Sequence, residues 1–256
     1  MNANIRTAIF VAAVAILAVV LSFTLYRDHS GEKNADALRV GVGEGISGIM
    51  LRDIAAAADS RDLDIDLMVF IDCCGNAAQW AMGSGDLDIG FYCSSIALTL
   101  INLNDELFIY GPAVMNSEVV ALSAETDMPG AMAIPLKRSF LSDLILENFP
   151  TVTEILQASP ITLQYALSDG RTDGVVLDIA QALRNPDADY MPISGEDYIS
   201  YSLVVRKEIV TTQQFADFVE LYNLVASDFN DREYMQDRFG MSGDFWEFVN
   251  LKFLYL

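Results

Sequence analysis

A fifteen-residue pattern occurs twice in the chain and constrains the fold more than any other feature. The segment QWAMGSGDLDIGFYC (79–93) aligns without gaps with QYALSDGRTDGVVLD (164–178). In both copies a helical pattern ends at a glycine, Gly85 or Gly170, and a buried strand follows after a short turn. A register kept over this length predicts two lobes of similar construction.

Strands and helices alternate around the first copy. Short apolar runs predict strands, and the amphipathic runs between them predict helices. The predicted strands are 38–43, 64–70 and 86–92, and the predicted helices are 47–58 and 75–82. This order is typical of parallel βαβ units, so we expect an α/β fold.

Two extended stretches mark where the chain passes between the lobes. Segment 107–123 predicts a crossover into the second lobe, and the strand 198–207 predicts the return. We expect hinges at Pro112–Ser117 and near Ser200. The expected organisation is a signal peptide or membrane anchor (1–27), a stalk (28–36), lobe 1 (37–112 and 200–256) and lobe 2 (113–199).

Two helices are predicted after the return strand. The first, from Thr211 to about Phe229, gathers its apolar residues on one stripe, which are Phe215, Phe218, Val219, Tyr222, Val225 and Phe229. The second begins at Asp244 and is apolar on most sides. We expect the domain to cover it.

The N-terminus carries an apolar run that predicts export. Arg6 precedes a stretch from Ala8 to Tyr26 without a charged residue. This length is near the lower limit for a membrane-spanning helix, and the layout is also that of a signal peptide. Either interpretation places the domain outside the cytoplasm, in the periplasm or at the cell surface.

The charge balance excludes several classes of function. The chain has 36 Asp and Glu against 15 Lys and Arg, a formal net charge of −21. Nucleic-acid binding needs clustered basic residues, so it is excluded, and adsorption to anionic lipid is disfavoured. The only histidine, His29, lies in the stalk, which excludes Ser-His-Asp and Cys-His catalysis. We expect a protein that is not an enzyme and has no resident cofactor.

All three cysteines, Cys73, Cys74 and Cys93, fall within FIDCCGNAAQWAMGSGDLDIGFYCSS (70–95). Exported proteins usually pair their thiols, but three is an odd number. Three interpretations stay open at this point. Cys93 forms a disulfide with Cys73 or Cys74, one or more cysteines are small buried apolar residues, or the thiols bind a ligand.

Several motifs resemble those of a known transport family. LRVGV (38–42), GDLDIGF (85–91), GRTDGVVLD (170–178) and YSLVVRKEIV (201–210), in this order, resemble the substrate-binding proteins of ABC transporters for nitrate, sulfonate, taurine and thiamine precursors. The resemblance covers about residues 37 to 240. It implies a two-lobed type 2 periplasmic-binding fold with a double crossover, preceded here by an N-terminal hydrophobic helix. It also implies an ABC permease and its ATPase as partners.

The cysteines depart from the common pattern of that family. DCCG (72–75) is similar to a smaller subgroup, the SaoB substrate-binding (seleno)proteins. These accompany a dedicated ABC permease and an organomercurial-lyase-like protein. The resemblance therefore implies an organometal as the ligand.

The strand order places the cysteines at a predicted cleft. Ligands of open α/β sheets bind at the carboxyl ends of the strands. The loops there carry the candidate lobe 1 residues Glu44, Gly45, Ser47, Cys73, Cys74, Cys93 and Ser94. Each cysteine lies in a loop that leads to a helix N-terminus, which lowers the pKa of a thiol.

Clustered thiolates at a cleft favour thiophilic metals over Mg²⁺ or Ca²⁺. A soft ion such as Hg(II), or an organometal, suits two or three thiolates without histidine. A zinc site normally has four nitrogen or sulfur ligands, and three thiols would need help from a carboxylate, so structural zinc is disfavoured. The prediction is a soft-metal or organometal site made by the three cysteines.

The second lobe offers different chemistry. Lys137 and Arg138 follow the predicted strand at 132–135 and are candidates for an anionic group, with Ser139 as a helix N-cap. Asp178 takes the place of Cys93 in the second copy and is either a helix N-cap or a residue that holds a cation or closes the cleft. If the cysteines are structural, Lys137 and Arg138 bind a small sulfonate or a nitrate-like anion instead.

A competing interpretation comes from GEGISG (43–48). It matches G-x-G-x-x-G after a strand, with Asp72 at the end of the next strand, which imitates the fingerprint of an NAD-dependent Rossmann oxidoreductase. A sensor domain of a signalling system is a further alternative. The preferred prediction is an extracytoplasmic substrate-binding protein whose two lobes close around a small ligand.

Overall fold

The computed structural model describes residues 37–124, 126–186 and 188–256. The predicted signal peptide or anchor, the stalk and the N-terminal hydrophobic helix lie outside these residues. Among the described helices, none has the length and apolar character needed to span a bilayer.

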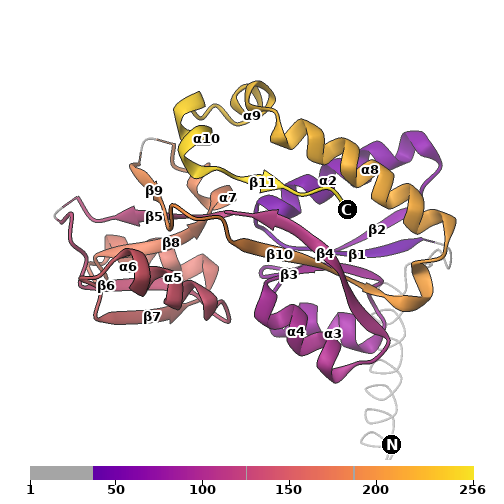
Figure 1. The fold of residues 1–256 in the computed structure, drawn as a ribbon, viewed down its shortest axis with the longest axis horizontal. Coiled ribbons are helices and arrows are strands. Elements are labelled where there is room, and N and C mark those ends of the chain that lie inside the picture. The colour runs from indigo at the N-terminus through magenta and orange to yellow at the C-terminus, as the bar shows by residue number, and fades with distance from the viewer. Residues whose placement is uncertain (1–36, 125, 187) are drawn as a thin grey trace, which may run out of the picture. The chain divides into compact units, whose positions relative to one another are not determined.

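Two separate sheets organise the described chain (Figure 1). The first has six strands in the order β11-β4-β10-β3-β1-β2. Its strands are β1 (Leu38–Val42), β2 (Ile65–Val69), β3 (Ile89–Tyr92), β4 (Leu107–Met115), β10 (Ile199–Arg206) and β11 (Lys252–Phe253). The three predicted strands of the first lobe, β1 to β3, are parallel to one another, as βαβ units require.

The second sheet has five strands in the order β7-β6-β8-β5-β9. They are β5 (Glu118–Leu122), β6 (Ala131–Pro135), β7 (Glu154–Ala158), β8 (Gly174–Asp178) and β9 (Tyr190–Pro192). Strands β6, β7 and β8 run parallel, and β5 pairs antiparallel to both β8 and β9. The described chain therefore has the predicted two-lobed α/β fold.

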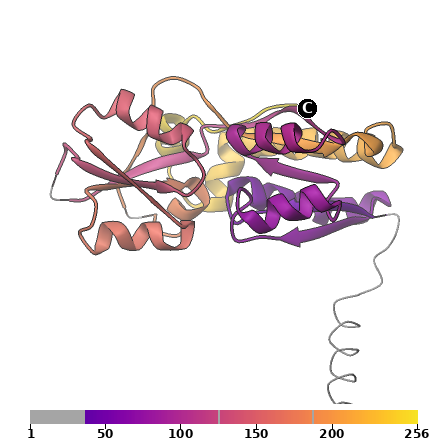
Figure 2. The same ribbon diagram turned by 90° about the horizontal axis from the view of Figure 1, so that it is seen from below.

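Helices cover both faces of each sheet. On the first sheet, α2 (Ile46–Ala58) and α8 (Gln213–Asn230) lie on one face, and α3 (Asn76–Ser84) and α4 (Ser94–Leu103) lie on the other (Figure 1). On the second, α5 (Phe140–Asn148) and α6 (Pro160–Ser168) lie on opposite faces, as Figure 2 shows. The short helices are α7 (Ile179–Ala182), α9 (Arg232–Phe239), α10 (Gly243–Val249), η1 (Asp59–Arg61) and η2 (Lys207–Ile209).

The repeated pattern has a structural reason in both lobes. Gly85 ends α3 with φ of 89°, and Gly170 follows α6 with φ of 66°, a left-handed conformation that favours glycine. The aspartates that the two copies share then perform the same task. The Asp88 carboxylate accepts a hydrogen bond from the Arg39 backbone at 2.9 Å, and Asp173 accepts one from Ala131 at 2.9 Å. Each aspartate thus fastens the neighbouring parallel strand.

Two crossing segments join the lobes side by side. The chain leaves β4 at Met115 and enters β5 at Glu118, and it returns into β10 at Ile199. Between them, the Asn116 backbone donates to the Tyr198 carbonyl at 3.2 Å, and the Tyr198 backbone donates to Asn116 Oδ1 at 3.0 Å. The two connections are therefore hydrogen-bonded to each other where they pass between the sheets.

The C-terminal region confirms one prediction and adds two elements. The aromatic stripe of α8 is buried as predicted, although Val219 is only half-buried. The predicted second helix is α10, whose Phe245, Trp246 and Val249 are buried while Phe248 is exposed. The sequence did not predict α9 or β11, which pairs with β4 and closes that edge of the first sheet.

Candidate functional site

The loops at the carboxyl ends of the parallel strands of both lobes meet around a small cavity. Its volume is about 30 Å³, and both lobes contribute to its wall. It is lined by Glu44, Gly45, Ile71, Asp72, Cys73, Pro135, Arg138, Pro160, Asp178, Gln181 and Tyr201. A larger cavity of about 390 Å³ lies beside α9, α10 and β11, and no predicted site residue lines it.

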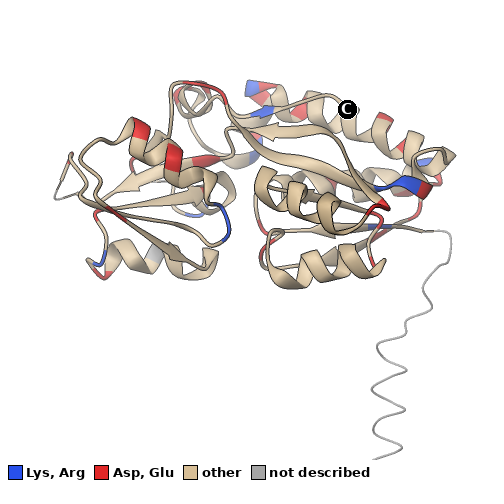
Figure 3. Cartoon of the chain, turned by 60° about the horizontal axis from the view of Figure 1, so that its bottom comes forward, with Lys and Arg blue, Asp and Glu red and all other residues tan. Residues whose placement is uncertain are grey.

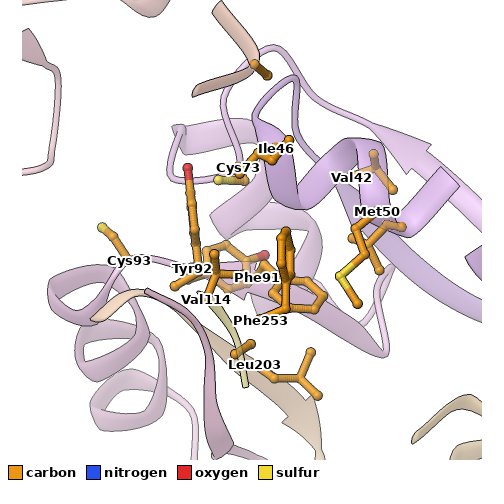
Figure 4. Packing of buried hydrophobic residues seen from close by; sticks show 14 of the residues in the cluster. Val42, Ile46, Met50, Cys73, Phe91, Tyr92, Cys93, Val114, Leu203 and Phe253 are labelled. Atoms are coloured by element: carbon orange, nitrogen blue, oxygen red, sulfur yellow. The ribbon is translucent and has the colours of Figure 1, made fainter. Parts of the chain in front are cut away.

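The three cysteines come together beside this cavity. Cys73 and Cys74 follow β2, and Cys93 is the residue immediately before α4. The sulfur atoms of Cys73 and Cys74 are 3.9 Å apart, and the Cys93 backbone N–H donates to the Cys74 sulfur at 3.2 Å. Cys73 lines the cavity, whereas Cys74 and Cys93 have no exposed surface. In Figure 4, Cys73 and Cys93 lie at the edge of the core cluster.

The cysteines are free thiols in this structure, so it does not contain the disulfide that was one interpretation of the sequence. Gly43 helps to bring the thiols against β1, because a Cβ at this position would lie 3.0 Å from the Cys73 Cβ. The loop after β1 and the loop after β2 therefore pack directly on each other.

The thiols have different protonation states. The hydrogen bond from Cys74 lowers the pKa of Cys93 to about 6, against the effect of burial, and the positive charge of Arg138 acts in the same direction. The hydrogen bonds of Cys74 with Cys73 and Cys93, together with burial, raise the pKa of Cys74. At neutral pH, Cys93 is therefore a thiolate and Cys74 is a thiol that donates to it. Thiolate character is what metal binding and nucleophilic reactivity require.

Arg138 is buried at the junction of the two lobes, with 5% of its surface exposed. Its guanidinium donates to Glu118 and to the hydroxyl of Tyr201, and it lies over the Tyr201 ring at 4.7 Å. Glu118 also accepts from Ser200 Oγ at 2.7 Å. The charge predicted for an anionic ligand is thus paired with a carboxylate of the protein.

Glu118 was missed by the sequence reasoning, and Ser200 was expected only as a hinge position. The available signal was a charged residue in the otherwise apolar strand EVVAL. Glu118 lies opposite Asp178 in the pairing of β5 with β8, which brings both carboxylates to the same end of the second sheet.

Asp178 confirms one of its two predictions and extends it. It is the N-cap of α7, accepting from the Ala180 backbone at 2.8 Å, with Gln181 completing a capping box. The same carboxylate oxygen accepts from the Ile46 backbone at the start of α2, in the other lobe, at 2.8 Å. Burial raises the pKa of Asp178 to about 6, although the charge of Arg138 opposes this. One carboxylate therefore caps a helix in each lobe.

The glycine loop 43–48 serves this contact. A Cβ on Gly45 would lie 2.5 Å from Asp178 Oδ2, so only glycine lets the carboxylate reach α2. In a Rossmann dinucleotide site the pyrophosphate would occupy this helix N-terminus. Here a carboxylate of the chain already occupies it, and the cavity is far below the volume of usual cofactor pockets. The geometry does not fit the oxidoreductase alternative.

Lys137 contacts lobe 1 but does not line the cavity. Its ammonium donates to Asn76 Oδ1, and its carbonyl lies 3.7 Å from the Cys93 sulfur and 3.5 Å from Ser95 Oγ. Its φ of 65° turns that carbonyl toward the thiol loop. Lys137 therefore covers Cys93 from the second lobe.

Of the remaining predicted residues, Glu44 lines the cavity and the three serines do not. Ser139 is the N-cap residue of α5, as predicted, but its side chain makes no capping hydrogen bond. Its backbone is already helical, whereas the backbone of a residue that caps through its side chain is normally extended. Ser47 is buried in α2, and Ser94 begins α4 without lining the cavity. Glu44 lines the cavity and is 3.8 Å from Arg184.

Asp72 is a site residue that the sequence analysis selected only for the NAD-dependent alternative. Its carboxylate and the thiols of Cys73 and Cys74 have donor atoms that all lie within 4.8 Å of one another. The sequence signal was its position directly before the two cysteines. The acidic residues as a whole are spread over both lobes (Figure 3), so acidity alone does not single out Asp72.

Comparison with known proteins gives matches at the level of structure alone. No protein-family model matches the sequence, and no curated protein matches it. One similar structure is the ligand-binding component of an ABC-type import system from Staphylococcus aureus with zinc bound. It has a TM-score of 0.66, with 15% identity, and the alignment covers 86% of each chain.

Two further structures show the same architecture. The alkanesulfonate-binding protein SsuA from Xanthomonas axonopodis has a TM-score of 0.61 at 14% identity, covering 83% of this chain and 82% of its own. A nutrient-binding protein from Burkholderia cenocepacia bound to methionine has a TM-score of 0.58 at 18% identity, covering 80% and 97%. The described part of the chain therefore has the two-lobed fold of these ligand-binding proteins.

Proposed function

We propose that this protein is the extracytoplasmic substrate-binding component of an ABC transporter. It captures a soft metal ion or an organometal between its two lobes and delivers it to a permease driven by an ATPase. Cys73, Cys74 and Cys93 are the ligand-binding residues. The observation that carries the proposal is the gathering of every thiol of the chain at the junction of the lobes.

The size and charge of the cavity support a small cationic ligand. A cavity of about 30 Å³ holds two or three water-sized atoms rather than an amino acid or an alkanesulfonate. Around the cavity, the buried acidic groups Glu118 and Asp178 and the Cys93 thiolate outnumber the buried guanidinium of Arg138. A ligand that adds positive charge offsets this excess when the lobes are closed.

The hinges belong to the same proposal. The segment Pro112–Ser117 and the chain near Ser200 connect the lobes, and rotation there opens the cavity. Asp178 and Lys137 are the contacts that break on opening, because each bonds to the opposite lobe. Ligand binding favours the closed state, which the permease recognises.

Titration of the reduced chain with Hg(II) and with methylmercury, each buffered by a small thiol, tests the proposal. Replacing Cys73, Cys74 and Cys93 together by serine is expected to lower the affinities for Hg(II) and methylmercury by more than about 100-fold. Mutating a residue that only supports a metal ligand already costs roughly 10- to 100-fold, and here the ligands themselves are removed. Ser94→Ala is the matched control, because it changes the neighbour of Cys93 without removing a thiol. Unchanged affinity in the triple variant would sink the thiolate proposal.

The anion alternative has one observation in its favour, the guanidinium of Arg138 at the cavity wall. Pairing with Glu118 weighs against it. Titration with methanesulfonate and nitrate separates the two functions. If the triple serine variant still binds either anion, anion binding at Arg138 would replace the thiolate proposal.

A further inference from the structure

A carboxylate oxygen lies beside the thiols and adds to the atoms that can bind a metal ion. Asp72, Cys73 and Cys74 are consecutive, and their carboxylate and sulfur atoms lie within 4.8 Å of one another. Asp72 and Cys73 both line the cavity between the lobes. Cys93 lies next to this group, because its backbone N–H donates to the Cys74 sulfur at 3.2 Å, but its own sulfur is not among the donor atoms that lie within 4.8 Å of one another. The chain thus offers two sulfur atoms and one carboxylate at one place, with a third thiol beside them.

The spacing of the sulfur atoms distinguishes between coordination geometries. With metal–sulfur bonds of about 2.3 Å, two thiolates of a tetrahedral site lie about 3.8 Å apart, whereas two thiolates bound linearly lie about 4.6 Å apart. The sulfur atoms of Cys73 and Cys74 are 3.9 Å apart. This separation matches the edge of a tetrahedron.

The backbone holds the Asp72 carboxylate ready for this role. Its Oδ1 accepts from the Cys74 backbone at 2.9 Å, and its carbonyl accepts from the Gly75 backbone at 3.0 Å. Among the described residues, the other carboxylate oxygen has no hydrogen-bond partner. A tetrahedral oxygen–sulfur edge is about 3.6 Å, so a shift of about 1 Å brings a carboxylate oxygen of Asp72 into the coordination sphere.

We propose that Asp72, Cys73 and Cys74 bind a bare four-coordinate divalent cation of the Cd²⁺ and Zn²⁺ class, and that the side chain of the neighbouring Cys93 turns from Lys137 toward the ion as its fourth ligand. The inference rests on the proposed function, since it assumes that the cleft thiols bind the ligand, and it narrows the ligand from soft metals in general. Carboxylate oxygen suits these ions, whereas a linear Hg(II) or organomercury centre needs only two sulfur atoms. Each thiol that becomes a ligand releases its proton to solvent, and no electron is transferred.

Titration of the reduced full chain with Cd²⁺ tests the donor set, because bound thiolates give an ultraviolet charge-transfer absorption. One Cd²⁺ is expected to bind with an absorption of three thiolates. Asp72→Asn keeps the oxygen that bonds the Cys74 backbone but removes the charge. We expect it to weaken Cd²⁺ and Zn²⁺ binding by about 10-fold or more and to leave methylmercury affinity within about twofold, since that ion does not use the carboxylate.

The matched control is Asp66→Asn, the same substitution on the exposed face of β2. It is expected to leave all three affinities unchanged. Cys93→Ser supplies a second measurement, with the Cd²⁺ absorption falling from three thiolates to two. Circular dichroism establishes that each variant is folded.

The outcomes separate this inference from the proposed function. If methylmercury binds through the thiols but Cd²⁺ does not, or if Asp72→Asn binds Cd²⁺ as tightly as the parent, the four-ligand site is refuted and the soft-metal function stands. If neither probe binds the reduced thiols, both are refuted.

Discussion

The buried carboxylate of Asp178 predicts a pH dependence of stability that can be calculated. Replacing it by asparagine keeps the shape and an oxygen acceptor for the Ile46 and Ala180 backbones but removes the ionisable group. In the folded protein, burial raises the pKa of Asp178 from 3.8 to about 6. The unfolded chain, in which the carboxyl is hydrated, has the ordinary value.

The sign follows from proton binding. Between pH 3.8 and 6 the folded state holds the proton that the unfolded state has lost. The contribution to stability is therefore complete below the unfolded pKa and is lost as the pH rises through the folded pKa. A shift of about 2 pKa units corresponds to about 3 kcal/mol, of which about 2 kcal/mol falls between pH 4.5 and 7.5.

Urea unfolding of the parent and of Asp178→Asn at these two pH values measures this contribution. The free energy of unfolding of the parent is expected to fall by about 2 kcal/mol more than that of the variant as the pH rises. The subtraction removes other titrating groups, including Cys93. Equal pH dependence in the two proteins, or a steeper fall in the variant, would refute the account of Asp178 as a desolvated carboxylate between the lobes.

Three other perturbations test separate parts of the site. An absorption titration of the parent is expected to show one thiolate forming with a midpoint at about pH 6, and this transition is expected to be missing from Cys93→Ser. A first midpoint near pH 9 in the parent would contradict the assignment of Cys93 as a thiolate. Gly45→Ala places a Cβ 2.5 Å from Asp178 and is expected to weaken Hg(II) binding, because it hinders closure of the two lobes. Gly195→Ala, which has open space around it, is the control. Equal Hg(II) affinities of the two variants in titration would contradict the role of the contact between Gly45 and Asp178. Arg138→Met leaves Glu118 buried without its partner and is expected to cost about 3–5 kcal/mol in urea unfolding, and a loss below about 1 kcal/mol would contradict the pairing.

Local patterns were sufficient to predict the elements that carry the site. The repeat at 79–93 and 164–178 predicted a helix, a left-handed glycine and a buried strand in both lobes, because each feature is decided within a few residues. The alternation of strands and helices placed Cys73 and Cys93 in loops at the carboxyl ends of β2 and β3, the two parallel strands that flank β1. α9 was missed because REYMQDRF is polar on most sides and has no clear apolar stripe.

The partners within the site depend on contacts between distant segments. Arg138, which follows β6, pairs with Glu118 of β5 across the intervening strand β8, and Asp178 bonds to Ile46 in the other lobe. No periodicity records such contacts, so the sequence assigned Arg138 to a ligand and left Glu118 unnoticed. The sequence did not predict the hydrogen bond from Lys137 to Asn76 for the same reason, because this contact depends on how the two lobes meet.

Counting the thiols that a bound metal protects tests the central claim most directly. The reduced chain is loaded with one equivalent of Hg(II), dialysed against a small thiol, and its free thiols are then counted. The account predicts that the metal stays bound and that two or three of the three cysteines are protected. Loss of the metal to the small thiol with all three cysteines still free would contradict the claim that the thiols between the lobes are the binding site.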